Sequence, residues 1–309
     1  MREGNKRFRR GLLTHCYQRS KDGCVLFYDD ADRLSMFTVM CRSATRHGIK
    51  LVSVCLMPDH IHFAAIASDS ARLSGFVRDY SSAFAKDYDL EYGLRGSVFS
   101  TPYGSAVKNG DKAARTNIIY IFRNPVERRL CEEAGKYRWN FMAYAINSSP
   151  FSQPVPLRYA SAALRRSFKY AEILYKQGSC LTIGRCRSLL NSMSFEDRQR
   201  FIDYVVCLYS VLDHGYVKSL FGNYLNLVHA VNYSKGSEYD INEIFTGRSD
   251  KLFDQIGQMI VRTGNPADIH DLFRITPERR FELFEKYCEA FPFQINQVAK
   301  YFHLELRGG

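Results

Sequence analysis

The sequence predicts an α+β fold, with one antiparallel sheet and its helices in the first half of the chain and a mostly α-helical second half. Apolar, β-branched stretches alternate with helix-like stretches at first, whereas later segments nearly all have helical spacing, as between Phe201 and Val205. Residues 147–156 hold three of the nine prolines, a composition typical of a linker. We therefore predict a first domain over 1–147 and a helical accessory domain over 157–309.

The first four elements follow from local patterns. Residues 11–19 carry β-branched and aromatic residues without helical spacing, which indicates a strand. Acidic residues from Asp29 onward cap a predicted helix that ends near Gly48. Two apolar runs, 49–57 and 60–66, are separated by a Pro-Asp turn, so they predict two consecutive strands.

Three more elements complete the first domain. Helical spacing returns over 71–88, a further strand is predicted over 98–107, and a helix is predicted over 112–123. We expect this last helix to stop at Asn124-Pro125, because the residue before a proline is disfavoured in the α region. The predicted order is β-α-β-β-α-β, which is the ferredoxin-like arrangement of an antiparallel sheet with two helices on one face.

Charge and cysteine usage restrict the function class. Lys and Arg number 43 against 32 Asp and Glu, a net charge of +11 that points to a polyanionic partner such as nucleic acid. Residues 1–150 hold 23 of the basic and 15 of the acidic side chains, so most of the excess lies in the first half. No apolar run is long enough to span a bilayer, and nine scattered cysteines without a C-x-x-C pair indicate reduced thiols. We expect a cytoplasmic protein with no membrane partner.

His60 and His62 are the strongest local signal for chemistry. They lie two apart in a predicted strand, so both imidazoles point to one face, about 7 Å apart along the chain. Two such nitrogens can share one metal ion. The alternative is a pair of histidines that simply form hydrogen bonds at a sheet surface.

Tyr120 and Asn124 form a second pair. They are four residues apart in the predicted helix over 112–123 and its end, so they share one helix face. A phenol and an amide oxygen then point the same way. The alternative is that Tyr120 packs in the core and that Asn124 caps the helix before the proline.

The blocks around these residues resemble single-tyrosine HUH transposases. The resemblance covers about residues 10–145, and within that superfamily it is strongest to the REP-associated tyrosine transposases. The blocks that carry it are Thr14-His15-Cys16-Tyr17-Gln18-Arg19, Leu26-Phe27-Tyr28-Asp29-Asp30, Val54-Cys55-Leu56-Met57-Pro58-Asp59-His60-Ile61-His62-Phe63, Tyr120-Ile121-Phe122-Arg123-Asn124-Pro125-Val126 and Tyr137-Arg138-Trp139.

The resemblance implies a role for each residue of the two pairs. His60 and His62 fall on the histidine pair of the HUH motif, Tyr120 on the nucleophile, and Asn124 on the polar residue that completes the metal site. It also implies Mg²⁺ or Mn²⁺ as the cofactor and single-stranded DNA with REP-like hairpins as the substrate. Zinc is the second candidate ion, because imidazoles suit it.

Two positions depart from the family's pattern. Asp59 stands where the family usually has Asn, which adds negative charge near the ion. Glu127-Arg128-Arg129 follows the block from Tyr120 to Val126, where the family usually has a small residue and a glycine, and this change concerns DNA contacts rather than the nucleophile.

Basic residues at two places are candidates for holding DNA. One set precedes the first strand and the other surrounds the predicted catalytic helix, where they would neutralise phosphates. The alternative is a solvated tail and an ordinary helix surface. The candidates are Lys6, Arg7, Arg9, Arg10, Lys112, Arg115 and Arg123.

Our hypothesis is therefore metal-dependent cleavage and strand transfer of single-stranded DNA through a covalent 5′-phosphotyrosine at Tyr120. Two alternatives remain: a domesticated protein that binds DNA or structured RNA without cutting it, and a metal hydrolase of small substrates that uses water. Residues 293–304 resemble the opening of a helix-turn-helix, or they form an ordinary amphipathic helix. A monomer and a homodimer both remain open.

Overall fold

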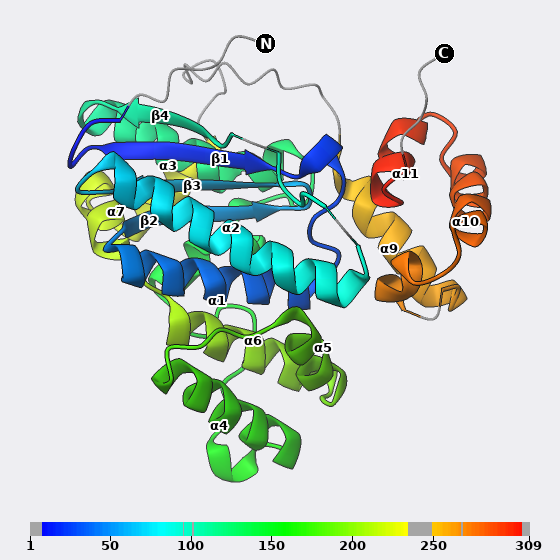
Figure 1. Ribbon diagram of the computed structural model, residues 1–309. Coiled ribbons are helices and arrows are strands. Elements are labelled where there is room, and N and C mark those ends of the chain that lie inside the picture. The colour runs from blue at the N-terminus through cyan, green and yellow to red at the C-terminus, as the bar shows by residue number, and fades with distance from the viewer. Residues whose placement is uncertain (1–7, 95, 101, 234–248, 267, 305–309) are drawn as a thin grey trace.

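A computed structural model describes residues 8–94, 96–100, 102–233, 249–266 and 268–304. Its centre is a four-stranded antiparallel sheet in the order β2-β3-β1-β4 (Figure 1). The predicted α+β, ferredoxin-like fold is confirmed. The strands are β1 (Leu13–Arg19), β2 (Lys50–Met57), β3 (His60–Ile66) and β4 (Gly104–Lys108).

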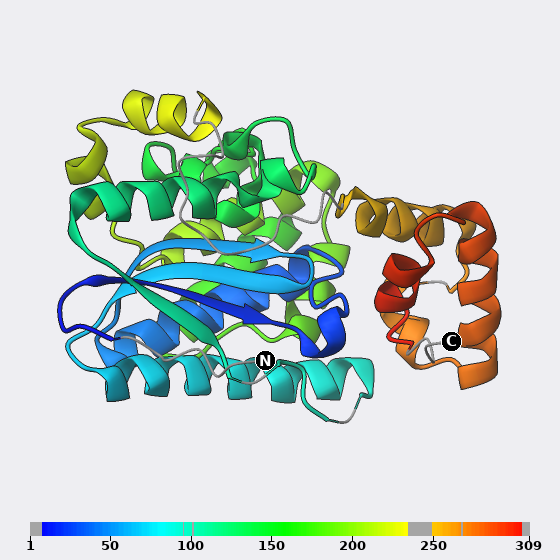
Figure 2. The same cartoon turned by 90° about the horizontal axis from the view of Figure 1, so that it is seen from above.

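Two long helices, α1 (Asp30–His47) and α2 (Ser70–Tyr92), cover one face of the sheet (Figure 2). The N-cap of α1 is Asp29, whose carboxylate accepts two backbone N–H groups in a capping box, and α1 ends at Gly48 with φ of 62°. Such a left-handed residue favours glycine, so both ends of α1 are fixed locally, as predicted.

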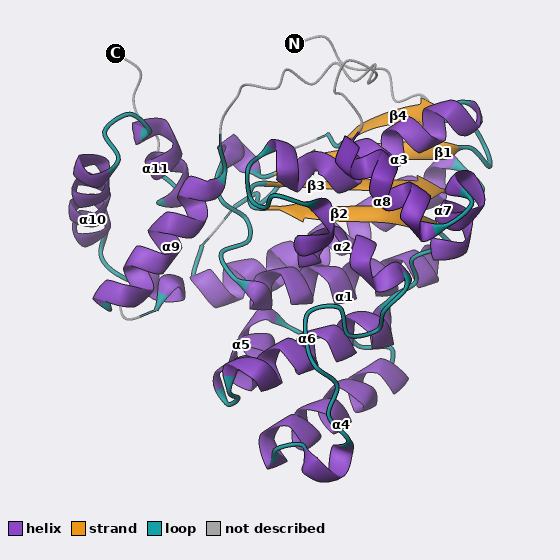
Figure 3. Ribbon diagram, turned by 180° about the vertical axis from the view of Figure 1, so that it is seen from behind, coloured by secondary structure: helices purple, strands orange, loops and turns teal. Residues whose placement is uncertain are grey.

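The opposite face of the sheet is covered by α3 (Gly110–Glu127), with α7 (His214–Phe221) and α8 (Tyr224–Tyr233) packed on α3 (Figure 3). Alternate side chains of β3 point to the two faces, because a strand has a period of two. Phe63 lies in the core beneath α1 and α2, whereas Ala64 lies in the smaller core beneath α3.

Two predicted boundaries are wrong, and both involve proline. Of the strand predicted over 98–107, only the part that forms β4 pairs continuously with a neighbouring strand. Pro102 lacks an N–H group to donate to such pairing. Before it, Phe99 forms only an isolated bridge with Ser20. Helix α3 continues through Pro125 to Glu127, and the Arg128 N–H donates to the Asn124 carbonyl at 3.0 Å. A proline near a helix end removes one hydrogen bond, and burial of Asn124 and Pro125 outweighs that loss.

The helices α4 (Ala162–Lys176), α5 (Ile183–Asn191) and α6 (Phe195–Tyr209) form a layer below α1 (Figure 1). Their buried apolar side chains belong to the same core as those of α1 and α2. The division into domains 1–147 and 157–309 stays a prediction. Short 3₁₀ helices occur at η1 (Lys21–Gly23), η2 (Ala134–Lys136), η3 (Arg138–Asn140), η4 (Met142–Ala145), η5 (Leu157–Tyr159) and η7 (Ile269–Phe273).

The last helices are α9 (Lys251–Thr263), α10 (Pro277–Ala290) and α11 (Ile295–Tyr301), which stand beside the sheet (Figure 1). Over the described ranges no helix follows α11, so the resemblance to a helix-turn-helix extends only to an opening helix. No helix within those ranges combines the length and the apolar character that a membrane crossing requires.

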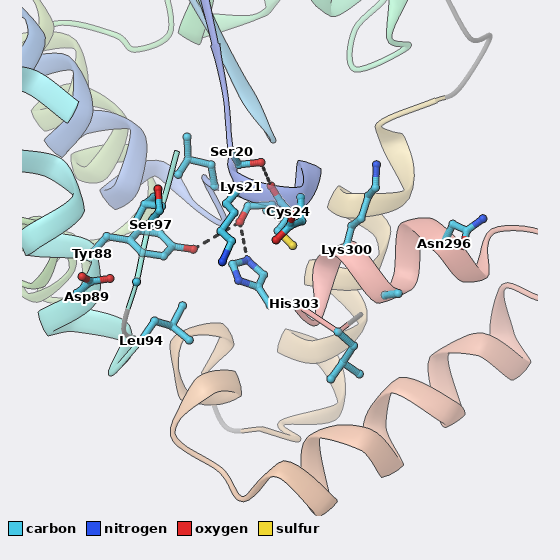
Figure 4. Close-up of a pocket in the computed structure, with 17 residues that line it drawn as sticks. Ser20, Lys21, Cys24, Tyr88, Asp89, Leu94, Ser97, Asn296, Lys300 and His303 are labelled. Carbon is cyan, nitrogen blue, oxygen red and sulfur yellow. Dashed lines mark hydrogen bonds between the residues drawn. The ribbon is translucent and has the colours of Figure 1, made fainter. Parts of the chain in front are cut away.

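A cavity of about 660 Å³ separates α11 from the edge of the sheet domain (Figure 4). His303 crosses it, and its Nε2–H donates to the Val25 carbonyl at 2.9 Å, while the Tyr88 hydroxyl donates to the same carbonyl at 3.4 Å. Neither the predicted metal ligands nor Tyr120 lines this cavity. The cavity is therefore separate from the predicted catalytic and metal-binding residues.

The His303 contact predicts a pH dependence of stability. Burial lowers the pKa of His303 to about 4, so the unfolded chain takes up a proton on this imidazole at a higher pH than the folded chain does. The contribution of His303 to stability is complete above its unfolded pKa of about 6.5 and is lost as the pH falls from there toward 4.

The His303→Gln variant keeps an N–H donor but does not titrate. We expect its free energy of unfolding to fall less than that of the wild type between pH 6.5 and pH 5, by about 1 kcal/mol. Urea denaturation at several pH values measures this difference. Equal pH profiles for the two proteins would contradict the assignment.

Candidate active site

The strand register brings the two motif histidines together on the α3 side of the sheet. His60 and His62 alternate with Ile61 on β3, so their rings lie on one face, with centroids 4.8 Å apart and planes at 89°. Both are buried, at 5% and 1% exposure. Burial lowers the pKa of His62 well below its ordinary value, and the nearby His60 adds to this effect, so His62 is neutral and has a lone pair to offer.

Helix α3 places Tyr120 over these rings. The Tyr120 and His62 centroids are 5.4 Å apart, with the ring planes at 84°, and Tyr120 is 7% exposed. Three of the predicted site residues therefore meet on one face of the sheet, although they lie up to 60 positions apart in the sequence.

Asn124 lies one helical turn beyond Tyr120 on the same face of α3, and it is 4% exposed. Because α3 continues past Pro125, Asn124 does not cap the helix; the C-cap is Arg128. Its amide nitrogen is buried and has no hydrogen-bond partner among the described residues. The capping alternative for Asn124 is therefore excluded.

His15, on β1, is a site residue that sequence reasoning missed. Its Nε2 lies 3.0 Å from the Nδ1 of His62, and the two rings are stacked with centroids 5.2 Å apart. His15 also meets Tyr120 edge-on at 5.7 Å. Burial, and next the charge of Lys108, lowers the pKa of His15 to about 3, so this third imidazole is neutral.

Asp59 contacts the first motif histidine, His60. Its Oδ1 lies 2.5 Å from the Nδ1 of His60. Burial raises the pKa of Asp59, but the charge and the hydrogen bond of His60 outweigh it and hold the pKa below its ordinary value. The Asp59 carboxylate therefore contacts the Nδ1 atom of His60, on the side of the ring opposite to Nε2.

The carboxy-terminal half reaches this site through Asp250, immediately before α9. Asp250 lies 3.7 Å from the Arg128 guanidinium, and its N–H donates to the Arg128 carbonyl at 3.0 Å. Burial, and next the charge of Asp59, raises the pKa of Asp250 to about 6. This contact could not be predicted from local sequence, because 122 positions separate the two residues.

Tyr17 forms a wall of the site on the β4 side. It pairs with Gly104 across the sheet, and its ring centroid lies 6.4 Å from that of His62. A Cβ at position 104 would lie 2.1 Å from a Tyr17 ring carbon, so only glycine leaves room for this ring.

These side chains fit a divalent ion with a mixed donor set. In the part of the chain that the structure describes, no three His, Cys, Asp or Glu side chains are grouped as metal ligands. An amide oxygen can be the third ligand, and Asn124, whose amide nitrogen is buried without a hydrogen-bond partner among the described residues, carries one. The oxygen and nitrogen of an amide are nearly isosteric, so a half-turn of the amide group can bring the oxygen to face the ion.

The predicted DNA-binding residues are in different situations, and their role stays a prediction. Lys6 and Arg7 lie outside the described residues. Arg9 and Arg10 are exposed just before β1, and Lys112 and Arg115 are exposed on the first turns of α3. Arg123 is half-buried, 3.6 Å from Glu127 and 3.5 Å from the Val231 carbonyl.

Comparisons with known proteins concern mainly the part of the chain that forms the sheet. Residues 12–123 match a family model described as Transposase IS200 like. No curated protein matches the chain. A solved structure, that of a REP-associated tyrosine transposase bound to a REP hairpin, is similar over 52% of this chain and 92% of that chain, with 13% identity and a TM-score of 0.40.

Proposed function

We propose that this chain cleaves and rejoins single-stranded DNA through Tyr120, and the match of residues 12–123 to the family model of IS200-like transposases supports this proposal. The observation that carries the proposal is the edge contact between the Tyr120 ring and His62, at 5.4 Å, on the face that also holds His60. A nucleophile beside two imidazoles that can bind a metal ion is what phosphodiester transfer requires.

The chemistry of Tyr120 is nucleophilic substitution at phosphorus. Its phenol oxygen attacks the scissile phosphate, the bond from phosphorus to the 3′ oxygen breaks, the phenol proton passes to solvent, and the leaving oxygen takes up a proton. The product is a 5′-phosphotyrosine and a free 3′-hydroxyl. The new bond conserves the phosphodiester, so a second 3′-hydroxyl can reverse the step and join another strand.

A free phenol has a pKa of about 10 and is a poor nucleophile at neutral pH. His60, His62 and Asn124 would hold Mg²⁺ or Mn²⁺, and the bound ion would supply neutralisation of the phosphate charge. The chain's own contribution is to hold these three ligands and the phenol on two elements, β3 and α3, whose packing fixes them.

We propose single-stranded DNA beside a REP-like hairpin as the substrate. The support is the net charge of +11, together with the exposed cations Arg9, Arg10, Lys112 and Arg115 close to the ends of β1 and α3. Such cations neutralise phosphates, so we expect DNA affinity to fall steeply with salt. Lys6, Arg7 and Arg123 belong to the same proposal.

The test is to incubate the wild-type chain with Mn²⁺ and an oligonucleotide that carries a hairpin and a single-stranded flank. We expect a covalent adduct that keeps a label at the 3′ end of the DNA and loses one at the 5′ end, because the tyrosine captures the 5′ phosphate. EDTA should abolish it, and peptide mass spectrometry should place the DNA on Tyr120.

Two outcomes would reject this function in favour of the alternatives. Tight, salt-sensitive binding without any cleavage would indicate a domesticated binding protein. Metal-dependent cleavage that leaves no label on the protein would indicate that water is the nucleophile.

A further inference from the structure

In both motif histidines, His60 and His62, the Nδ1 atom contacts a neighbouring side chain. The other ring nitrogen, Nε2, is the one that would face a shared ion. His60 Nδ1 lies 2.5 Å from a carboxylate oxygen of Asp59, and His62 Nδ1 lies 3.0 Å from Nε2 of His15. A carboxylate that is ionised only accepts, so Asp59 fixes His60 with its proton on Nδ1 and a lone pair on Nε2. The question is what the His15 contact does to His62.

The fold builds the His15 contact from three buried rings. On β1, Tyr17 is the register partner of His62, and His15 lies two residues away on the same face. His15 and His62 are 4% and 1% exposed, and their planes are within 25° of parallel. Tyr120 closes the cluster, with its ring edge-on to both. A hydrogen bond at such a site is not exchanged with water.

A neutral imidazole carries one N–H, so one ring donates and the other accepts. If His15 donated, the proton of His62 would be on Nε2, and His62 would have no lone pair for an ion. If His62 donates, its Nε2 carries the lone pair, as in His60. The Nε2 of His15 contacts the Nδ1 of His62 at 3.0 Å, so His15 acts through His62 and not on the ion.

We propose that His15 is a positioning residue that accepts the Nδ1–H of His62, fixing its tautomer and ring orientation so that Nε2 faces the divalent ion. This inference rests on the proposed function. The imidazole of His15 then orients one ligand, His62, and the carboxylate of Asp59 orients the other, His60.

Mn²⁺ binding by titration calorimetry tests the proposal on the full chain without DNA. The His15→Leu variant keeps a similar volume but has no acceptor, and we expect its Kd for Mn²⁺ to rise about 10- to 100-fold. The His15→Gln variant offers an amide oxygen near the position of Nε2, so it should restore most of the affinity. Unchanged binding in His15→Leu would overturn the proposal, and so would a His15→Gln variant that binds as weakly as His15→Leu.

A second measurement needs no substitution. Long-range ¹H–¹⁵N spectra of the metal-free wild type, with His62 assigned from its Ala variant, report which nitrogen of that ring is protonated. We expect the proton on Nδ1, and a proton on Nε2 would overturn the proposal.

The His62→Ala variant distinguishes an error in the proposed metal site from an error in the role of His15. If it binds Mn²⁺ as tightly as the wild type, the metal site of the proposed function is wrong. If it loses Mn²⁺ while His15→Leu does not, the metal site stands and only the role of His15 is wrong.

Discussion

The Tyr120→Phe variant should form no covalent adduct with hairpin-bearing DNA, and its cleavage rate should fall by at least about 10⁴-fold, as when a nucleophile is removed from an enzyme. Only one oxygen is lost, so the ring should keep its contacts with His15 and His62 and the fold should be unchanged. Adduct formation on a denaturing gel and DNA binding by fluorescence anisotropy, with equal affinity expected for both proteins, measure the two effects separately.

Tyr17→Phe is the matched control. Tyr17 borders the same site and is 37% exposed, so its phenol is more accessible than that of Tyr120. We expect this variant to keep its adduct. An adduct that persists in Tyr120→Phe and disappears in Tyr17→Phe would identify Tyr17, on β1, as the nucleophile and would refute the assignment of Tyr120.

The Asp203→Ala variant should lose about 3–5 kcal/mol of the free energy of unfolding. Asp203, on α6, is fully buried and accepts hydrogen bonds from the Tyr144 hydroxyl at 2.6 Å, the Ser152 hydroxyl at 2.7 Å and the Phe151 N–H at 3.2 Å. It also lies 3.3 Å from the buried Arg138 guanidinium. Removal of the carboxylate leaves this cation without its counter-charge.

Urea denaturation measures the effect, with two reference variants. Asp203→Asn keeps one carbonyl oxygen as an acceptor and should lose less stability than Asp203→Ala. Glu289→Ala removes an exposed carboxylate on α10 and should change stability by less than about 0.5 kcal/mol. If Asp203→Ala is as stable as Glu289→Ala, the hydrogen bonds around Asp203 do not hold the proline-rich segment 147–156 to α6.

The sequence was sufficient wherever the signal was local. Strand β3 has the predicted bounds, because an apolar run that directly follows a Pro-Asp turn indicates a strand. Helix α1 ends at Gly48, as its capping residues indicated. The prediction for α3 was wrong at its end, because tertiary burial of Asn124 and Pro125 overrides the local preference against a helical residue before proline. Packing of this kind cannot be read from one segment.

The candidate site shows the same limit. His60, His62 and Tyr120 were found because spacing within one strand and one helix, together with a family resemblance, pointed to them. His15 was missed because its contact with His62 depends on the pairing of β1 with β3, which joins residues 47 positions apart. The Asp250–Arg128 contact is more remote still, since it requires the arrangement of the carboxy-terminal helices against α3.

The space that Gly104 leaves for Tyr17 has a thermodynamic consequence. The aromatic ring fills the volume that a side chain at position 104 would take, so its orientation is fixed when the sheet forms. The entropic cost of immobilising that ring is therefore met during folding, so a ligand that binds beside Tyr17 would meet a surface that needs no further ordering.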